Sequence, residues 1–468
     1  MPFNSVAFIL GILPLILLLY AAAARFGQEA GKYSLVVASL GFYTLCAPAY
    51  LPLLLISVLG NIALARAIMR SGRAIAWGVV ANLALLCWFK YATPLIWPGR
   101  VLPPGISFFT FSQIGLLLWL AVPANEAPRL IDQTLFALFF PAILAGPILN
   151  PADTLPSIRN DAGRRLNAVT LATGLGFFCI GLVKKGLLAD PLGPLVAAVF
   201  DDPSHAGSQA AWIGAVGWYL QLYFDFSGYS DMAIGLGTLF GVLMPDNFDQ
   251  PYRAASITQY WQRWHMSLTR FLMSNVHAPL TLRILRRRRV QGLPINEAAQ
   301  RRPTGFLAMI AAPIITTMVL AGLWHGATAS YLLFGVAHAG FLLVNHAWRV
   351  WGGPRLPPLA AIALTQTAVL AGAVIFRAAS PGDAWSVFAA MAGSHGPGEP
   401  DPQALLQAAW LCLLYALLWL APTTRQFIQG AGPLAWRPSP PVAVAMGCLA
   451  TIGLLACGGT QAFVYFSF

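Results

Sequence analysis

Two of the seven histidines in this 468-residue sequence stand where an imidazole could do chemistry. The first, His325, lies in Gly322-Leu323-Trp324-His325-Gly326, between two long apolar stretches. The glycines predict a helix break at membrane depth, which is tolerated mainly where the chain lines a cavity. Ionisable groups in such places are candidate functional residues. The alternative is a neutral histidine that is hydrogen-bonded within a helix bundle.

The second, His265, lies in the segment Tyr260-Trp261-Gln262-Arg263-Trp264-His265-Met266-Ser267-Leu268. Trp261, Trp264 and His265 recur at the spacing of one helical face, which predicts a short amphipathic helix near a membrane interface. Imidazole titrates near neutral pH and is suited to removing a proton from a hydroxyl or thiol. Two histidines that reach one cavity would suit that step. As an alternative, the segment is an interfacial anchor and its histidine is incidental.

Two carboxylates, Asp225 and Asp231, interrupt the apolar run around Tyr223 to Asp231. A charge at membrane depth costs at least about 2.5 kcal/mol unless it is paired or hydrated. Lys184, Lys185 and Arg263 border other apolar segments and are the expected partners. Six residues also place the two acids about 240° apart on a helix. We therefore interpret them as structural braces and not as a catalytic carboxylate pair.

The other histidines predict no metal site. His338 follows His325 by thirteen residues, which is roughly 220° around a continuous helix, so we expect no joint ligation of a metal. The sequence contains no phosphate-binding glycine loop and no HExxH motif. We expect neither a metal nor a bound cofactor.

The elements that must position these residues are membrane-spanning helices. The chain is 58% hydrophobic and 9% charged, against roughly 25% charged residues in an average soluble domain. Stretches of about 20 apolar residues, enough to cross a bilayer, recur along the chain. Backbone groups in lipid must bond to one another, so the spans are helices. The sequence predicts one all-α polytopic membrane domain over residues 1–468, with about eleven spans and some re-entrant or interfacial pieces.

A net charge of +12 would suggest nucleic acid in a soluble protein. In a membrane protein the same excess follows from basic loops that remain on the cytoplasmic side, so we expect no nucleic-acid partner. Residues 283–302 carry seven arginines and one acid, Glu297, and predict a cytoplasmic loop. Such a loop could also dock an acidic partner or anionic lipid headgroups.

The segments around these residues resemble the membrane-bound O-acyltransferase family, and its alginate O-acetyltransferase branch most. The resemblance rests on segments that occur in the same order along nearly the whole chain. They are Leu102 to Phe108, Ala145-Gly146-Pro147, Gly181 to Lys185, Tyr223 to Gly235, Pro245 to Phe248, Trp261 to Ser267, Gly322 to Gly326 and Phe376-Arg377-Ala378.

This resemblance implies a ring of transmembrane helices with a thinned centre. It implies His325 as the essential histidine and His265 as the second, with a cytoplasmic thioester donor, acetyl-CoA or an acyl carrier protein, as substrate. Expected pocket residues are Trp324, Trp264, Arg263, Ser227 and Tyr229. It also implies a bacterial inner membrane location, a polysaccharide acceptor, and a periplasmic or membrane-anchored acetyltransferase partner.

The sequence departs from the family pattern at two places. No histidine precedes Ala145-Gly146-Pro147, and the segment after His265 runs through His277 into the arginines instead of ending in Pro-Leu-Gly-Gly. Both changes bear on how the donor docks and on which acceptor is used. A transporter or flippase of a glycan precursor and a non-catalytic scaffold for polysaccharide assembly remain alternatives, since broken helices and intramembrane acids also mark substrate pathways.

Overall fold

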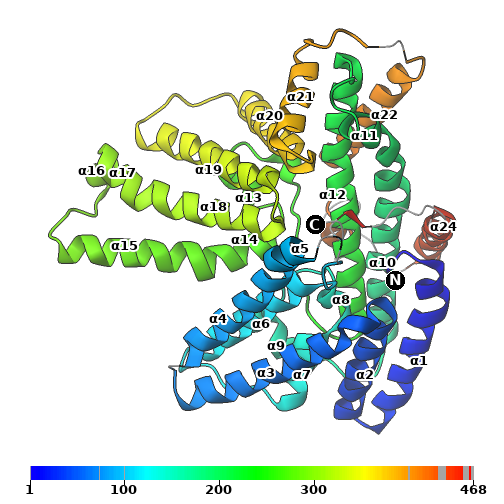
Figure 1. Ribbon diagram of the computed structural model, residues 1–468. Coiled ribbons are helices and arrows are strands. Elements are labelled where there is room, and N and C mark those ends of the chain that lie inside the picture. Colours follow the sequence, from blue (N-terminus) through cyan, green and yellow to red (C-terminus); the bar gives the residue numbers. More distant parts are fainter. Residues whose placement is uncertain are drawn as a thin grey trace. The chain divides into compact units, whose positions relative to one another are not determined.

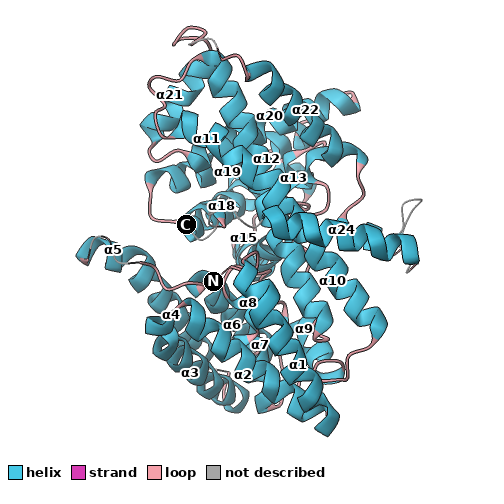
Figure 2. Ribbon diagram, turned by 90° about the vertical axis from the view of Figure 1, so that its right-hand side faces the viewer, coloured by secondary structure: helices cyan, strands magenta, loops and turns pink. Residues whose placement is uncertain are grey.

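The computed structural model describes residues 2–72, 74–97, 99, 101–398, 401–428, 430, 439–456 and 463–464. Within these ranges the ordered elements are helices, and the only strand-like pairing is an isolated bridge between Phe248 and Trp264 (Figure 2). The prediction of an all-α protein is confirmed.

Seven helical stretches among the described residues are long and apolar enough to cross a membrane. They are Phe8–Phe26, Pro48–Arg70, Ala74–Ile96, Ala168–Phe200, Pro303–His325, Ala329–Val350 and Pro358–Arg377. Three shorter apolar helices add to them: Ile106–Leu120, Ala404–Leu420 and Pro440–Ala456. The chain is a multi-pass membrane protein. Several helices are shorter than the predicted spans because Pro and Gly limit them. The helix Ile106–Leu120, for example, begins only after Gly105, whose φ is 79°.

The chain forms two compact units. Unit 1 comprises residues 1–187, 224–247 and 422–468, and unit 2 comprises residues 188–223 and 248–421. Helix α12 (Ser208–Leu239) is labelled in Figure 1. Its residues up to Tyr223 belong to unit 2, and those from Phe224 on belong to unit 1.

The remaining helices of unit 1 come mainly from the first part of the chain. They are α1 (Leu13–Ala23), α2 (Gln28–Cys46), α3 (Leu51–Arg70), α4 (Ala74–Cys87), α5 (Thr93–Ile96), α6 (Ile106–Leu120), α7 (Leu130–Leu138), α8 (Phe140–Ile143), α9 (Pro151–Asn160), α10 (Ala168–Val183), α23 (Thr424–Ile428) and α24 (Pro440–Ala456), with π-helical turns η1 (Phe8–Ile12) and η4 (Trp88–Ala92). The π-helical turn η5 (Lys184–Ala189) begins in unit 1 and ends in unit 2.

Unit 2 carries the helices around both candidate histidines. They are α11 (Gly193–Phe200), α13 (Ile257–Trp261), α14 (Met266–Leu272), α15 (Ala278–Val290), α16 (Glu297–Gln300), α17 (Pro303–Phe306), α18 (Ala312–His325), α19 (Ala329–Val350), α20 (Pro358–Arg377), α21 (Pro381–Met391) and α22 (Ala404–Leu420), with π-helical turns η8 (Met273–His277) and η9 (Leu307–Ala311).

Glycine brings α18 and α19 into close contact. A methyl group at Gly335 of α19 would lie 2.5 Å from the Met318 carbonyl oxygen of α18, and one at Gly322 would lie 2.3 Å from the Tyr331 carbonyl oxygen. Both distances are below van der Waals contact, so only glycine permits this approach. Small residues play the same part between helices in membranes generally. The close pair fixes where α18 ends, and hence where His325 lies within unit 2.

The arginine-rich segment differs from the expected loop. Arg283 and the run from Arg286 to Arg289 lie on α15, and a turn then leads to α16. Arginine and leucine are good helix formers, which explains why this segment is helical.

Candidate functional site

His265 does not lie within a continuous amphipathic helix, and that prediction is wrong. Helix α13 ends at Trp261 and α14 begins at Met266, and His265 between them has the left-handed backbone at φ 44°. This conformation is uncommon for residues other than glycine, although histidine is among those enriched in it. Backbone outliers of this kind cluster at functional sites.

A short antiparallel contact explains the break. The Asp249 amide donates to the Arg263 carbonyl oxygen at 3.0 Å, within the bridge that joins Phe248 to Trp264. That carbonyl therefore bonds outside the helix. The Trp264 ring packs at centroid distances of 5.1 Å from Phe248 and 5.6 Å from Tyr260. The chain turns sharply at the next residue, His265, whose carbonyl oxygen accepts the first bond of α14 from Thr269 at 3.0 Å.

His325 is the last residue of α18, as the flanking glycines indicate. Gly326 has extended backbone, and α19 starts at Ala329. A methyl group at Gly326 would lie 2.4 Å from the Tyr331 ring, so the missing side chain makes room for that aromatic residue. The predicted break is present, and it turns the chain back on itself beside the imidazole.

The two histidines converge on one indole. The Trp324 ring centroid lies 5.7 Å from that of His265 and 4.8 Å from that of His325, both in edge-to-face geometry. His265 is 1% exposed, His325 is 4% exposed and Trp324 is 6% exposed. The structure therefore brings together two imidazoles and an indole N–H inside unit 2.

His338 belongs to the same cluster, and the sequence interpretation missed it. Its ring centroid lies 4.5 Å from Phe334 and 5.2 Å from Trp261, and Phe334 in turn lies 6.0 Å from His325. The signal was the helix break predicted at His325, which the angular argument for His338 left out. Once α18 ends at His325, α19 returns alongside it, and the angular argument for a continuous helix no longer applies.

Aromatic rings pack around the cluster. Phe376 of α20 contacts His325 at 4.8 Å and Phe334 at 5.0 Å. Burial lowers the pKa of the His265 imidazole, so this ring is neutral at neutral pH. A neutral imidazole offers one hydrogen-bond donor and one acceptor, which are the two functions that a proton transfer needs.

The four predicted intramembrane charges pair with one another in unit 1. Lys185 Nζ lies 2.6 Å from Asp225 Oδ1, and Lys184 Nζ lies 2.6 Å from Asp231 Oδ2. The first pair is almost completely buried, with side chains 3% and 1% exposed, and the second is 17% and 12% exposed. A methyl group at Gly228 would lie 2.7 Å from the Gly181 carbonyl oxygen, so close packing of α10 on α12 brings the lysines to the acids.

Further bonds hold these carboxylates. The Val464 amide donates to Asp225 Oδ2 at 2.9 Å, and the Thr424 hydroxyl donates to Asp231 Oδ2 at 2.6 Å. Both acids thus connect distant parts of unit 1. The third expected partner, Arg263, lies in unit 2 and is partly buried.

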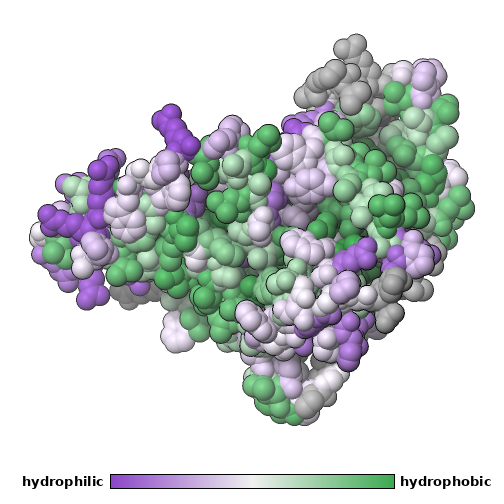
Figure 3. Space-filling model, turned by 90° about the horizontal axis from the view of Figure 1, so that it is seen from above, coloured by the Kyte–Doolittle hydropathy of each residue, from purple (hydrophilic) through white to green (hydrophobic). Residues whose placement is uncertain are grey.

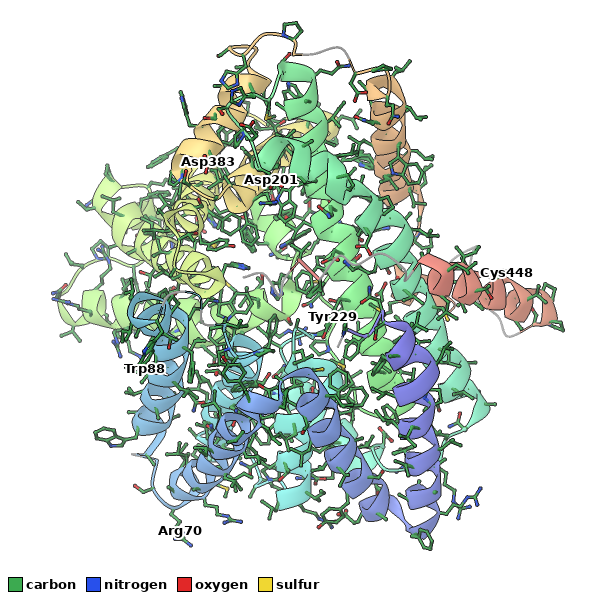
Figure 4. All side chains as sticks on the ribbon, turned by 45° about the vertical axis from the view of Figure 1, so that its right-hand side comes forward. Arg70, Trp88, Asp201, Tyr229, Asp383 and Cys448 are labelled. Carbon is green, nitrogen blue, oxygen red and sulfur yellow. The ribbon has the colours of Figure 1, made fainter. Side chains whose placement is uncertain are left out.

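The expected pocket residues are divided between the units. Trp324, Trp264 and Arg263 belong to unit 2 with the histidines, whereas Ser227 and Tyr229 lie on the part of α12 that belongs to unit 1. Tyr229, labelled in Figure 4, is sandwiched between aromatic rings, with centroids 4.4 Å from Phe463 and 5.1 Å from Phe3.

No group of three or more histidine, cysteine or acidic side chains is arranged to hold a metal among the described residues. The side chains present in the cluster offer the chemistry of imidazole and indole: proton transfer, and hydrogen bonds to a developing charge.

The fold and the cluster together define a class of protein: a multi-pass helical membrane protein in which buried imidazoles converge. The model of MBOAT, the membrane-bound O-acyltransferase family, matches residues 58–292. The chain belongs to this family, and it is an O-acyltransferase. The matched range includes His265 and ends before His325.

Full-length relatives extend the match. The chain is 32% identical over 443 residues to the peptidoglycan O-acetyltransferase of Helicobacter pylori, covering 84% of this chain and 80% of that protein. It is 34% identical over 420 residues to a probable alginate O-acetylase, AlgI, of Pseudomonas aeruginosa, covering 84% and 75%. A teichoic acid D-alanyltransferase of Streptococcus thermophilus is 28% identical over 250 residues, covering 52% and 57%.

Proposed function

We propose that this O-acyltransferase takes an acetyl group from a cytoplasmic thioester, which is acetyl-CoA or an acyl carrier protein. It passes the group across the bacterial inner membrane to hydroxyls of an exported polysaccharide. The transfer is direct or goes through a periplasmic or membrane-anchored partner. The observation that carries the proposal is the contact of both His265 and His325 with Trp324 inside a buried cluster. The relatives named for peptidoglycan and alginate O-acetylation support acetyl as the group and a glycan as the acceptor.

The chemical step follows from the cluster. An imidazole nitrogen of His325 accepts the proton of the attacking hydroxyl, and the hydroxyl oxygen forms a bond to the thioester carbonyl carbon. The carbonyl oxygen gains negative charge in the tetrahedral intermediate. The C–S bond then breaks, the carbonyl re-forms, and the thiolate takes the proton back from the imidazolium. No metal, oxidant or reductant is needed for this balance.

Stabilisation of the oxyanion requires donors in a place without water, where they act most strongly. The Trp324 indole N–H and the neutral His265 ring are the donors in contact with the cluster. His338, one aromatic ring away from His325, extends the polar set on the α19 side. In this proposal Trp324 and His265 assist the reaction, and His325 moves the proton.

The Lys–Asp pairs of unit 1 have no step in this chemistry. Each carboxylate bonds to a lysine and to a second group from a distant segment. We propose that Asp225, Asp231, Lys184 and Lys185 brace the membrane fold.

The test is acetyl transfer in proteoliposomes that contain the full chain, with labelled acetyl thioester on one side and an acceptor glycan on the other. His325→Ala should abolish transfer while folding is retained. The control is His205→Ala, because His205 is exposed and its ring contacts the nearby side chains of Asp202 and Ser204. Movement of a glycan precursor without any acyl transfer would instead support the transporter alternative, and unchanged glycan acetylation in a His265→Ala, His325→Ala double variant would support the scaffold.

A further inference from the structure

Unit 2 contains an apolar cavity that the proposed chemistry does not use. Its volume of about 360 Å³ lies within the range of small-molecule sites, roughly 300–1,000 Å³. It opens between η8 and α14 on one side and η9, α18 and α19 on the other. Its apolar lining includes Leu268, Leu272, Met273, Met309, Ile314 and Met318. An open cavity of this kind in a membrane protein is within reach of lipid acyl chains.

Exposed tryptophans close to the cavity predict a membrane–water interface at one end of it. His277 and His346 line the cavity. Trp348 near the end of α19 and Trp351 directly after this helix are 45% and 54% exposed. Tryptophans of this kind gather where the bilayer meets water. The Trp351 indole donates to the Arg301 carbonyl oxygen at 2.9 Å, so the arginine segment lies beside this aromatic pair.

The same end carries uncompensated positive charge. Helix α15 begins directly after His277, and at 1.5 Å per residue Arg283 lies about 9 Å further along it. Arg283, Arg286, Arg287 and Arg289 are exposed, and none of them forms an ion pair with a carboxylate of the described chain. Figure 3 shows hydrophilic surface at the α15–α17 end of unit 2, next to apolar surface.

We propose that the cavity holds one acyl chain of an anionic phospholipid whose phosphate is bound by the arginines of α15. Both parts of such a lipid meet the surface they require: hydrocarbon lies against leucine, isoleucine and methionine, and phosphate lies against guanidinium groups, which bind it in bidentate geometry. The arginines predict the cytoplasmic face, where anionic lipids attract basic segments. Trp261 lines the cavity and also contacts His338, so the lipid site adjoins the histidine cluster.

The experiment measures lipid retention by the purified full chain. The protein is extracted from membranes containing equal amounts of phosphatidylglycerol and phosphatidylcholine, and bound lipid is counted by native mass spectrometry. Wild type should retain phosphatidylglycerol in excess. Glycerol 3-phosphate, added alone at matched concentration, should not displace it, because the acyl chain contributes to binding.

Two variants separate the two halves of the site. Ile314→Trp fills the cavity; its control is Ile315→Trp, because Ile315 is the adjacent residue, is 42% exposed and does not line the cavity. Arg283→Gln with Arg286→Gln removes two charges; its control is Arg164→Gln with Arg165→Gln in unit 1. We expect each site variant to lower phosphatidylglycerol retention about tenfold or more and each control to leave it unchanged.

Three results would overturn the proposal. The first is equal retention of both lipids by wild type, and the second is retention by Ile314→Trp equal to that by Ile315→Trp. The third is an unchanged lipid count in Ile314→Trp together with a raised KM for the thioester donor, which would assign the cavity to the donor.

Discussion

Removing the negative charge of Asp225 tests whether the buried charges of unit 1 are braces. Asp225→Asn keeps the shape of the side chain and removes the counter-charge of Lys185. The Lys185 side chain is only 3% exposed, and its Nζ lies 2.6 Å from the Asp225 carboxylate. Breaking one partner of a buried ion pair costs about 3–5 kcal/mol, since the remaining charge stays buried. The bond from the Val464 amide should survive, because an amide oxygen also accepts.

The double variant supplies the control. Asp225→Leu with Lys185→Met removes both charges and replaces them with apolar side chains, which is often neutral or stabilising for a buried pair. The second pair, Lys184 with Asp231, is 17% and 12% exposed, so Asp231→Asn should cost less than Asp225→Asn. Its Thr424 bond reduces the loss further.

The assay combines thermal unfolding in nanodiscs with acetyl transfer per folded molecule. We expect Asp225→Asn to lower the unfolding temperature strongly, the double variant to restore it, and transfer per folded molecule to remain near wild type in the restored protein. A double variant that regains wild-type stability but transfers no acetyl group would refute the brace interpretation and assign Asp225 to the chemistry.

Three further predictions concern unit 2. Trp324→Phe keeps an aromatic ring but removes the indole N–H. If this N–H stabilises the oxyanion, kcat should fall about 10²–10³-fold with little change in stability. An unchanged kcat would show that Trp324 only packs against its neighbours. Gly372→Ala places a methyl group 2.3 Å from His338 Nε2, and overpacking should cost about 1–3 kcal/mol; chemical denaturation should show that adding His338→Ala relieves the clash. Gly335→Ala should lower the unfolding temperature, whereas Gly340→Ala on the same helix, with nothing within 4 Å of the new methyl group, should not.

The sequence predicted the membrane class and the break at His325 because both follow from local physics. An apolar run long enough to span lipid must be helical, and glycines on either side of a polar pair end a helix. The structure also shows why glycine is needed at the two positions that flank Leu323-Trp324-His325, which the sequence alone did not show. Gly326 leaves room for Tyr331, and Gly322 allows the α18–α19 contact.

The local structure at His265 could not be predicted from residue spacing. The regular recurrence of Trp261 and Trp264 favours a helix, but a contact with Phe248, sixteen residues before Trp264, breaks it. His338 was missed for a related reason, since its neighbourhood depends on α19 folding back along α18. In both places a long-range contact decided the outcome over a local pattern.

The central claim is that His325 moves the proton in acyl transfer, and the rate of acetyl transfer by His325→Ala tests it most directly. The measurement uses the purified full chain in proteoliposomes, with equal folded fractions established by unfolding and with His205→Ala as the control. The account predicts that transfer by His325→Ala falls to background, while His205→Ala matches wild type. Near-normal transfer by a folded His325→Ala protein would contradict it.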